Sequence, residues 1–199
     1  MTNKRVKPST ISVIIQSANP IFIIVVVFLP VGALIYSMNS DSVIILNYVH
    51  VMTGVLWTGI DLFMGFVLGP VLGGMEPKDR AVVFKRLIPK MTFLMPVLAA
   101  VTITSGIELA ERLGIASLSN LSVSLSNPWI LAAAIIVTLL TFQGFGILLP
   151  NEIRVFRQLL SEAPDIEKIS RLGMRNAKLG GVQGVLQLAI IFIMANLRF

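Results

Sequence analysis

The residues best suited to chemistry lie in one apolar stretch of the chain, residues 43–73. It contains the chain's single histidine, His50, together with Trp57 and an acidic residue, Asp61. Since an α-helix turns by about 100° per residue, these three side chains fall on one narrow face. His50 and Asp61 are separated by about 16 Å along the helix axis, so they share a face without touching.

These residue types favour two kinds of chemistry. An imidazole is a frequent metal ligand, and a carboxyl group inside an apolar span can carry a proton. A charged group in a membrane costs roughly 3 kcal/mol or more, so Asp61 should face the interior of a helix bundle. Two interpretations stay open for Asp61: a proton carrier, or a protonated carboxyl that joins helices through neutral partners. Such partners are available at Thr102, Thr104, Gln143, Gln183 and Gln187.

His50 also has a structural alternative, in which its ring bonds a neighbouring carbonyl and holds no ligand. Met91 and Met95 are one helical turn apart and could supply sulfur to copper, but methionine is also a common core residue. The chain has no cysteine, which excludes disulfides, thiolate metal sites and iron–sulfur clusters. No phosphate-binding, catalytic-triad or zinc motif occurs.

The elements that must position these residues are membrane spans. Hydrophobic residues make up 55% of the chain and charged residues only 13%, about half of what soluble domains carry. A span needs about 20 apolar residues. We therefore predict an all-α, polytopic membrane helical bundle, residues 1–199 forming a single integral membrane domain. The five predicted transmembrane helices cover about 21–38, 43–73, 91–109, 129–149 and 179–197.

The basic residues predict the orientation. Fourteen of the sixteen lysines and arginines lie in three alternating segments, residues 4–7, 78–90 and 154–178. Basic segments between spans stay on the cytoplasmic side. We expect a multi-pass protein of the cell membrane with a cytoplasmic N-terminus and an external C-terminus. The net charge of +6 is explained in this way without nucleic acid as a partner.

The segment 151–178 is predicted to be cytoplasmic and amphipathic. Its first half extends the fourth span and should break near Pro164, and a second short helix should begin at Asp165, which can cap it. The side chains expected to face the bundle or the lipid headgroups are Ile153, Phe156 and Leu160.

The region 48–109 resembles a known group of small membrane proteins. The residues that carry the resemblance are His50-x-x-x-Gly54-x-x-Trp57-x-Gly59, Phe63, Gly69-Pro70, and, after a basic loop, Phe84, Leu87, Pro89, Pro96 and Ser105-Gly106. The group includes CopD-type copper-resistance proteins, HemJ-type protoporphyrinogen oxidases and related integral membrane proteins. The resemblance implies a four-helix core, here the second to fifth spans, with one N-terminal helix ahead of it.

In HemJ-like members the matching histidine is associated with haem b, which carries over to His50 alone. The leading hypothesis is a haem-b-binding, redox-associated membrane protein in which His50 is the axial ligand, Trp57 packs against the cofactor and Asp61 carries a proton. A second histidine is lacking, so the other ligand would be a methionine, water or a histidine of another subunit. The alternatives are a copper-handling permease that uses His50 and methionines, and a cofactor-free accessory subunit of a larger membrane complex. Nothing in the sequence forces catalysis, and the expected partners are the lipid bilayer, other membrane subunits or a second copy.

Overall fold

The fold is an all-helical membrane bundle. The computed structural model of the chain describes residues 10–197, and within that range all regular structure is helical. Five helices are long and apolar enough to cross a membrane, which confirms the predicted fold class. They are Pro20–Asn39, Val43–Gly73, Pro77–Arg112, Pro128–Leu159 and Ile166–Leu197.

Two of these spanning helices are each divided into two α-helical parts. The second span is α3 (Val43–Leu62) followed by α4 (Gly69–Gly73), and the fourth is α7 (Pro128–Thr141) followed by α8 (Leu149–Leu159). The others are continuous: α2 (Pro20–Asn39), α5 (Pro77–Arg112) and α9 (Ile166–Leu197). Short helices α1 (Thr10–Ala18) and α6 (Leu121–Ser124) lie outside the spans, and a 3₁₀ turn, Leu118–Asn120, precedes α6.

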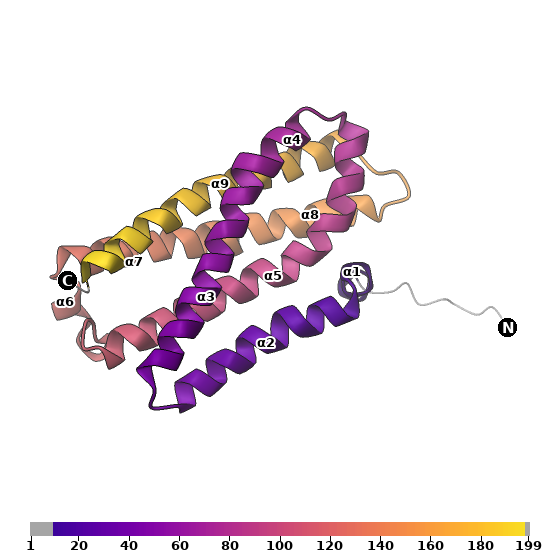
Figure 1. Ribbon diagram of the computed structural model, residues 1–199. Coiled ribbons are helices and arrows are strands. Elements are labelled where there is room, and N and C mark those ends of the chain that lie inside the picture. Colours follow the sequence, from indigo (N-terminus) through magenta and orange to yellow (C-terminus); the bar gives the residue numbers. More distant parts are fainter. Residues whose placement is uncertain (1–9, 198–199) are drawn as a thin grey trace.

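The helices that carry the candidate residues pack together as a core. α9 packs against α3, α5, α7 and α8, and α3 packs against α5. The N-terminal span α2 lies beside this core against α3 and α5, as Figure 1 shows.

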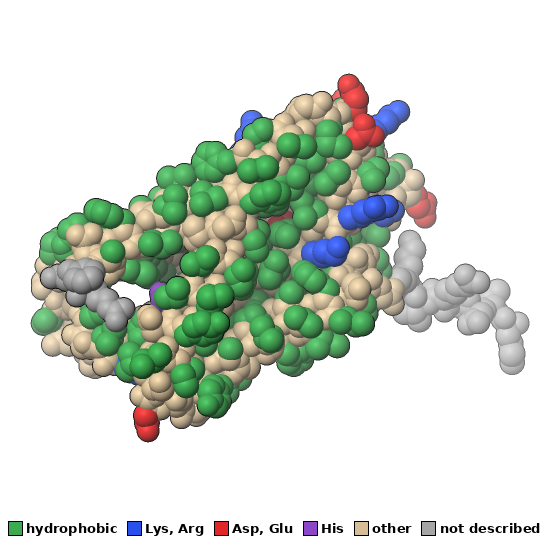
Figure 2. Space-filling model, viewed as in Figure 1, with side chains coloured by type: hydrophobic (Ala, Val, Ile, Leu, Met, Phe, Trp, Pro, Cys, Tyr) green, Lys and Arg blue, Asp and Glu red, His purple; other side chains and the backbone are tan. Residues whose placement is uncertain are grey.

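The surface has the polarity of a membrane protein. Apolar side chains such as Ile44, Phe142 and Phe192 are more than half exposed, and green apolar side chains cover most of the face drawn in Figure 2. Lysines and arginines gather on that face towards one end, which we call the basic end. It carries the turns at residues 74–76 and 160–165. Exposed apolar area of this extent is stable in contact with lipid.

The helices extend beyond the predicted spans at the basic end. α5 begins at Pro77 and α8 continues to Leu159. The prediction of a separate short helix after Asp165 is wrong, because that segment forms the first turns of α9. No proline interrupts residues 166–197, so nothing breaks the helix there. The predicted cap is confirmed, since Oδ1 of Asp165 accepts a hydrogen bond of 2.9 Å from the backbone N–H of Lys168.

A hydrophobic cluster closes the basic end of the bundle. Phe156, predicted to face the bundle, is buried there, whereas Leu160 is 43% exposed. The cluster joins side chains from α1, α4, α5, α8 and α9, namely Ile14, Leu72, Ala81, Phe84, Ile88, Val155, Phe156 and Ile169. The amphipathic part of the fourth span is thus packed into the core on its apolar side.

Two spans contain a π-helical segment, and the two segments have similar sequences. Phe63–Leu68 joins α3 to α4, and Phe142–Leu148 joins α7 to α8. Each begins with Phe-x-Gly-Phe and is followed within two residues by a proline, Pro70 or Pro150. Proline lacks a backbone N–H and its ring crowds the carbonyl four residues earlier, which loosens the preceding turn.

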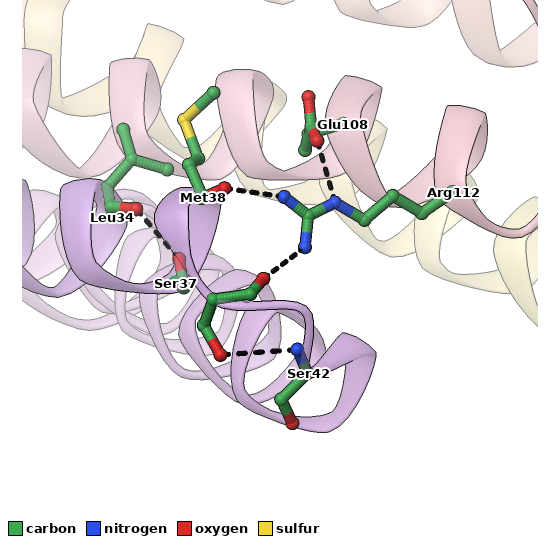
Figure 3. Close-up of polar contacts among 7 residues, drawn as sticks. Leu34, Ser37, Met38, Ser42, Glu108 and Arg112 are labelled. Carbon is green, nitrogen blue, oxygen red and sulfur yellow. Dashed lines mark hydrogen bonds and ion pairs between the residues drawn. The ribbon is translucent and has the colours of Figure 1, made fainter.

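Arg112 fastens the turn between α2 and α3 to the end of α5. Its guanidinium donates 2.6 Å hydrogen bonds to the carbonyls of Met38 and Ser40 and pairs with Glu108 at 2.7 Å, as Figure 3 shows. These carbonyls end α2 and have no partner within the helix, so an arginine at this place satisfies them. The contact fixes the start of α3, the helix that carries the candidate residues.

Candidate functional site: a buried histidine and a polar cavity

One face of α3 is turned into the bundle, as predicted. The side chains of His50, Trp57 and Asp61 are 8%, 4% and 2% exposed. They divide into two environments along the helix. His50 lies among polar residues of α5 in the half of the span away from the basic end, and Asp61 lies among residues of α9 nearer to it.

α5 holds the imidazole of His50 in one orientation. Nδ1 lies 2.9 Å from the backbone carbonyl oxygen of Thr102 and 3.3 Å from the hydroxyl oxygen of Ser105. A carbonyl only accepts hydrogen bonds, so Nδ1 carries a proton, and when the ring is neutral Nε2 is the unprotonated nitrogen. Close to the ring, the hydroxyl of Thr102 donates to the hydroxyl of Thr53 at 3.0 Å.

Gly106 is the second feature of α5 that positions the ring. A Cβ built on Gly106 would lie 2.8 Å from Cε1 of His50 and 3.2 Å from Nδ1, so only glycine lets the ring approach this closely. No residue within 10–197 forms a hydrogen bond with Nε2. In Figure 2 the face of the molecule is hollowed beside the purple histidine.

Asp61 joins α3 to α9. The side-chain amides of Gln183 and Gln187 both donate to Oδ2 of Asp61, at 3.2 and 3.0 Å. Gln183 and Gln187, two of the neutral partners predicted for Asp61, are therefore confirmed as its hydrogen-bond partners. Both glutamines are only 2% exposed. Gln143 instead donates to the backbone carbonyl of Leu179 at 2.7 Å.

Beside Asp61 the helices line a cavity of about 60 Å³. Four helices of the core contribute to it: Trp57 and Asp61 come from α3, Met91 and Met95 from α5, Glu152 from α8, and Gln183 from α9. The π-helical segments border it through Met64, Gly144, Phe145 and Leu148. π-helical turns are frequent at functional sites.

Three buried polar atoms near Asp61 have no hydrogen-bond partner among the described residues. They are Nε1 of Trp57 and the side-chain carbonyl oxygens of Gln183 and Gln187. Buried polar groups in proteins are nearly always paired, with ordered water if not with protein atoms. Trp57 and Gln183 are also among the residues that line the cavity.

Glu152 is a site residue that the sequence analysis missed. It is partly buried, lines the cavity opposite Asp61, and one carboxylate oxygen accepts a 3.1 Å hydrogen bond from the hydroxyl of Thr92. We expected the fourth span to end at residue 149, which placed Glu152 among charged cytoplasmic residues. Helical spacing could have indicated this role. Four cavity-lining residues of this span lie at positions i, i+3, i+4 and i+7 and so share one helix face, namely Phe145, Leu148, Leu149 and Glu152.

The structure places Trp57 at the wall of this cavity and in an apolar cluster with Leu98, Ala99 and Leu140. The predicted methionine pair, Met91 and Met95, lines the same cavity. His50 does not line it.

The chain is thus a multi-pass helical membrane protein whose core contains a cavity lined mostly by apolar residues together with Asp61, Glu152 and Gln183, and one buried histidine lies further along α3. No protein-family model, curated protein or solved structure matches it significantly. The resemblance to CopD-type and HemJ-type proteins accordingly stays a prediction.

Proposed function

We propose that this protein binds haem b through His50 and serves a membrane-bound redox reaction, with Asp61 as a proton carrier. The observation that supports this best is the orientation of His50. Its Nδ1–H donates to the carbonyl of Thr102, which leaves Nε2 as the ring nitrogen without a hydrogen bond among residues 10–197. Histidines that bind metals usually donate their other nitrogen to a carbonyl or carboxylate in this way.

The surrounding residues fit a single axial ligand. Among residues 10–197 no three histidines, aspartates or glutamates are close enough to hold a metal ion together. A haem needs only one ligand from the chain if water or another subunit provides the other, and a bound haem would supply one-electron transfer. In this proposal Ser105 and Gly106 orient the imidazole, and Asp61 carries a proton while its Oδ2 accepts hydrogen bonds from Gln183 and Gln187.

A second candidate is copper handling, and one observation favours it. Met64, Met91 and Met95 line one cavity together with the carboxyl of Asp61. Thioether sulfur prefers Cu(I). This version differs from the permease predicted from the sequence, because the methionines surround Asp61 and not His50.

We also propose that the basic end faces the cytoplasm, in the cell membrane. The turn at residues 74–76 precedes the predicted cytoplasmic segment 78–90, and the turn at residues 160–165 lies within the predicted cytoplasmic segment 154–178. The rule that basic residues stay inside then puts the His50 half of α3 on the external side.

Protein purified in mild detergent tests these candidates through its visible spectrum and its metal content. For haem, we expect a Soret band that His50→Ala abolishes and that the double variant Met91→Leu/Met95→Leu retains. For copper, we expect bound metal that the double variant loses and that His50→Ala retains. A colourless, metal-free protein of normal assembly would refute both candidates and would leave the accessory-subunit hypothesis, in which Asp61 only joins α3 to α9.

A further inference from the structure

We propose that the cavity between Asp61 and Glu152 holds water through which the two carboxyl groups exchange a proton, and that Glu152 is the point of entry from the basic end. This deepens the proton-carrying role proposed for Asp61. It does not depend on haem, because it concerns only side chains of this chain.

The two acidic residues line one cavity. Asp61 lines the cavity from α3 and Glu152 lines it from α8. One buried water needs roughly 10–15 Å³ of such volume. A cavity of about 60 Å³ therefore has room for a short chain of waters.

Two residues that line the cavity each have a buried polar side-chain atom without a hydrogen-bond partner among residues 10–197. Trp57 offers an unpaired N–H, and Gln183, which is 2% exposed, offers an unpaired carbonyl oxygen. The carboxylate oxygens of Asp61 and Glu152 add further acceptors. A buried water typically forms two to four hydrogen bonds, and this set is sufficient. Most of these polar atoms are hydrogen-bond acceptors. The cavity therefore suits a ligand that donates hydrogen bonds, such as water or a hydrated proton.

No fixed positive charge competes for the two carboxyl groups. The cavity lining contains no lysine or arginine, and among residues 10–197 neither Asp61 nor Glu152 forms an ion pair. Facing Glu152 are Thr92 from α5 and Asn176 from α9, both neutral. Arg154, the nearest basic residue on α8, donates instead to the side chain of Asn151. In a low-dielectric interior two neighbouring carboxylates repel, and a bound proton is the available counter-charge.

The order along the membrane follows from helix geometry. Asp61 is twelve residues from Gly73, the end of its span, which is about 18 Å. Glu152 is seven residues from Leu159, about 10 Å. Glu152 is thus nearer to the basic end. In one transfer, the Glu152 carboxyl gives its proton to a cavity water, that water gives a proton to the Asp61 carboxylate, and Glu152 is reprotonated from the solution at the basic end. The charge balances, and no oxidant or reductant is needed.

Infrared difference spectroscopy on the full chain in lipid bilayers tests the proposal. The carbonyl-stretch band of a protonated carboxyl shifts when the group exchanges its proton for deuterium, so the exchange can be timed. We expect a band that Asp61→Asn removes and a second that Glu152→Gln removes. In Glu152→Gln, exchange at Asp61 should slow by roughly a hundredfold, the size typical of removing a positioned proton donor. Glu162→Gln, which changes an exposed carboxyl on the 160–165 turn, is the matched control.

Three outcomes would overturn the proposal. The first is exchange at Asp61 that proceeds at the wild-type rate in Glu152→Gln. The second is a wild-type protein with no protonated-carboxyl band from acid to alkaline pH. The third is a band that NaCl abolishes and choline chloride does not, which would make the cavity a sodium site. A colourless protein that shows the two expected bands would refute the haem proposal alone, so the two failures are distinguishable.

Discussion

Replacement of Gly106 by alanine should displace the imidazole of His50. The new Cβ would lie 2.8 Å from Cε1 of the ring, whereas carbon atoms in contact are normally about 3.5–4.0 Å apart. The ring must therefore retreat from α5 by about 0.7–1.2 Å. Nδ1 is 2.9 Å from the Thr102 carbonyl on the same helix, so this retreat takes the pair beyond hydrogen-bonding distance.

Gly106→Ala should lower both the stability of the fold and the affinity for haem. Overpacking and the lost hydrogen bond should destabilise the fold by about 1–3 kcal/mol. If Nε2 binds haem, the loss of the bond that orients the ring should weaken binding by roughly 10- to 100-fold, the range seen when such supporting bonds are removed. Gly59→Ala is the control, because nothing lies within 4 Å of the Cβ that it adds.

The single histidine makes the assay direct. Protein labelled with ¹⁵N in histidine gives one imidazole signal set, which reports the protonated nitrogen without assignment. Wild type and Gly59→Ala should show Nδ1–H and an unprotonated Nε2, and Gly106→Ala should show a mixture of tautomers. A wild-type ring protonated at Nε2 would refute the reasoning, as would a Gly106→Ala protein with unchanged signals and unchanged haem affinity.

Three further predictions concern the fold. Gly65→Ala would put a Cβ 2.6 Å from a backbone nitrogen of α9. Its free energy of unfolding in detergent should therefore be about 1–3 kcal/mol lower than that of Gly59→Ala. Equal stability of the two variants would contradict the close backbone contact. Arg112→Met leaves two helix-end carbonyls without donors, and the α2–α3 turn should become sensitive to protease while the other turns do not. Reporter fusions at Ser119 and Pro164 should give external and cytoplasmic signals respectively, and the opposite pattern would invert the proposed orientation.

The polar residues of the site were predictable to different degrees. Asp61 was found because an acidic residue in an apolar span is costly, and Gln183 and Gln187 because they share a helix face. Gln143 was an equally good candidate by the same criteria, yet it bonds the Leu179 carbonyl. Helical spacing gives the face of a side chain within its own helix but not which neighbouring helix it meets.

The sequence by itself determined the spans and the inward face of α3. Apolar length sets what can cross a bilayer, and a costly polar group must turn away from lipid. Only the tertiary structure decided that Glu152 and Asp61 line one cavity, that Gly106 allows the imidazole of His50 to lie against α5, and that Met91 and Met95 line that cavity while His50 does not. These contacts join residues far apart in the chain, and they depend on how four helices are rotated and shifted against one another. Helix packing fixes those rotations and shifts through the fit of small and large side chains, such as Gly65 against Gly181, which composition and periodicity do not encode.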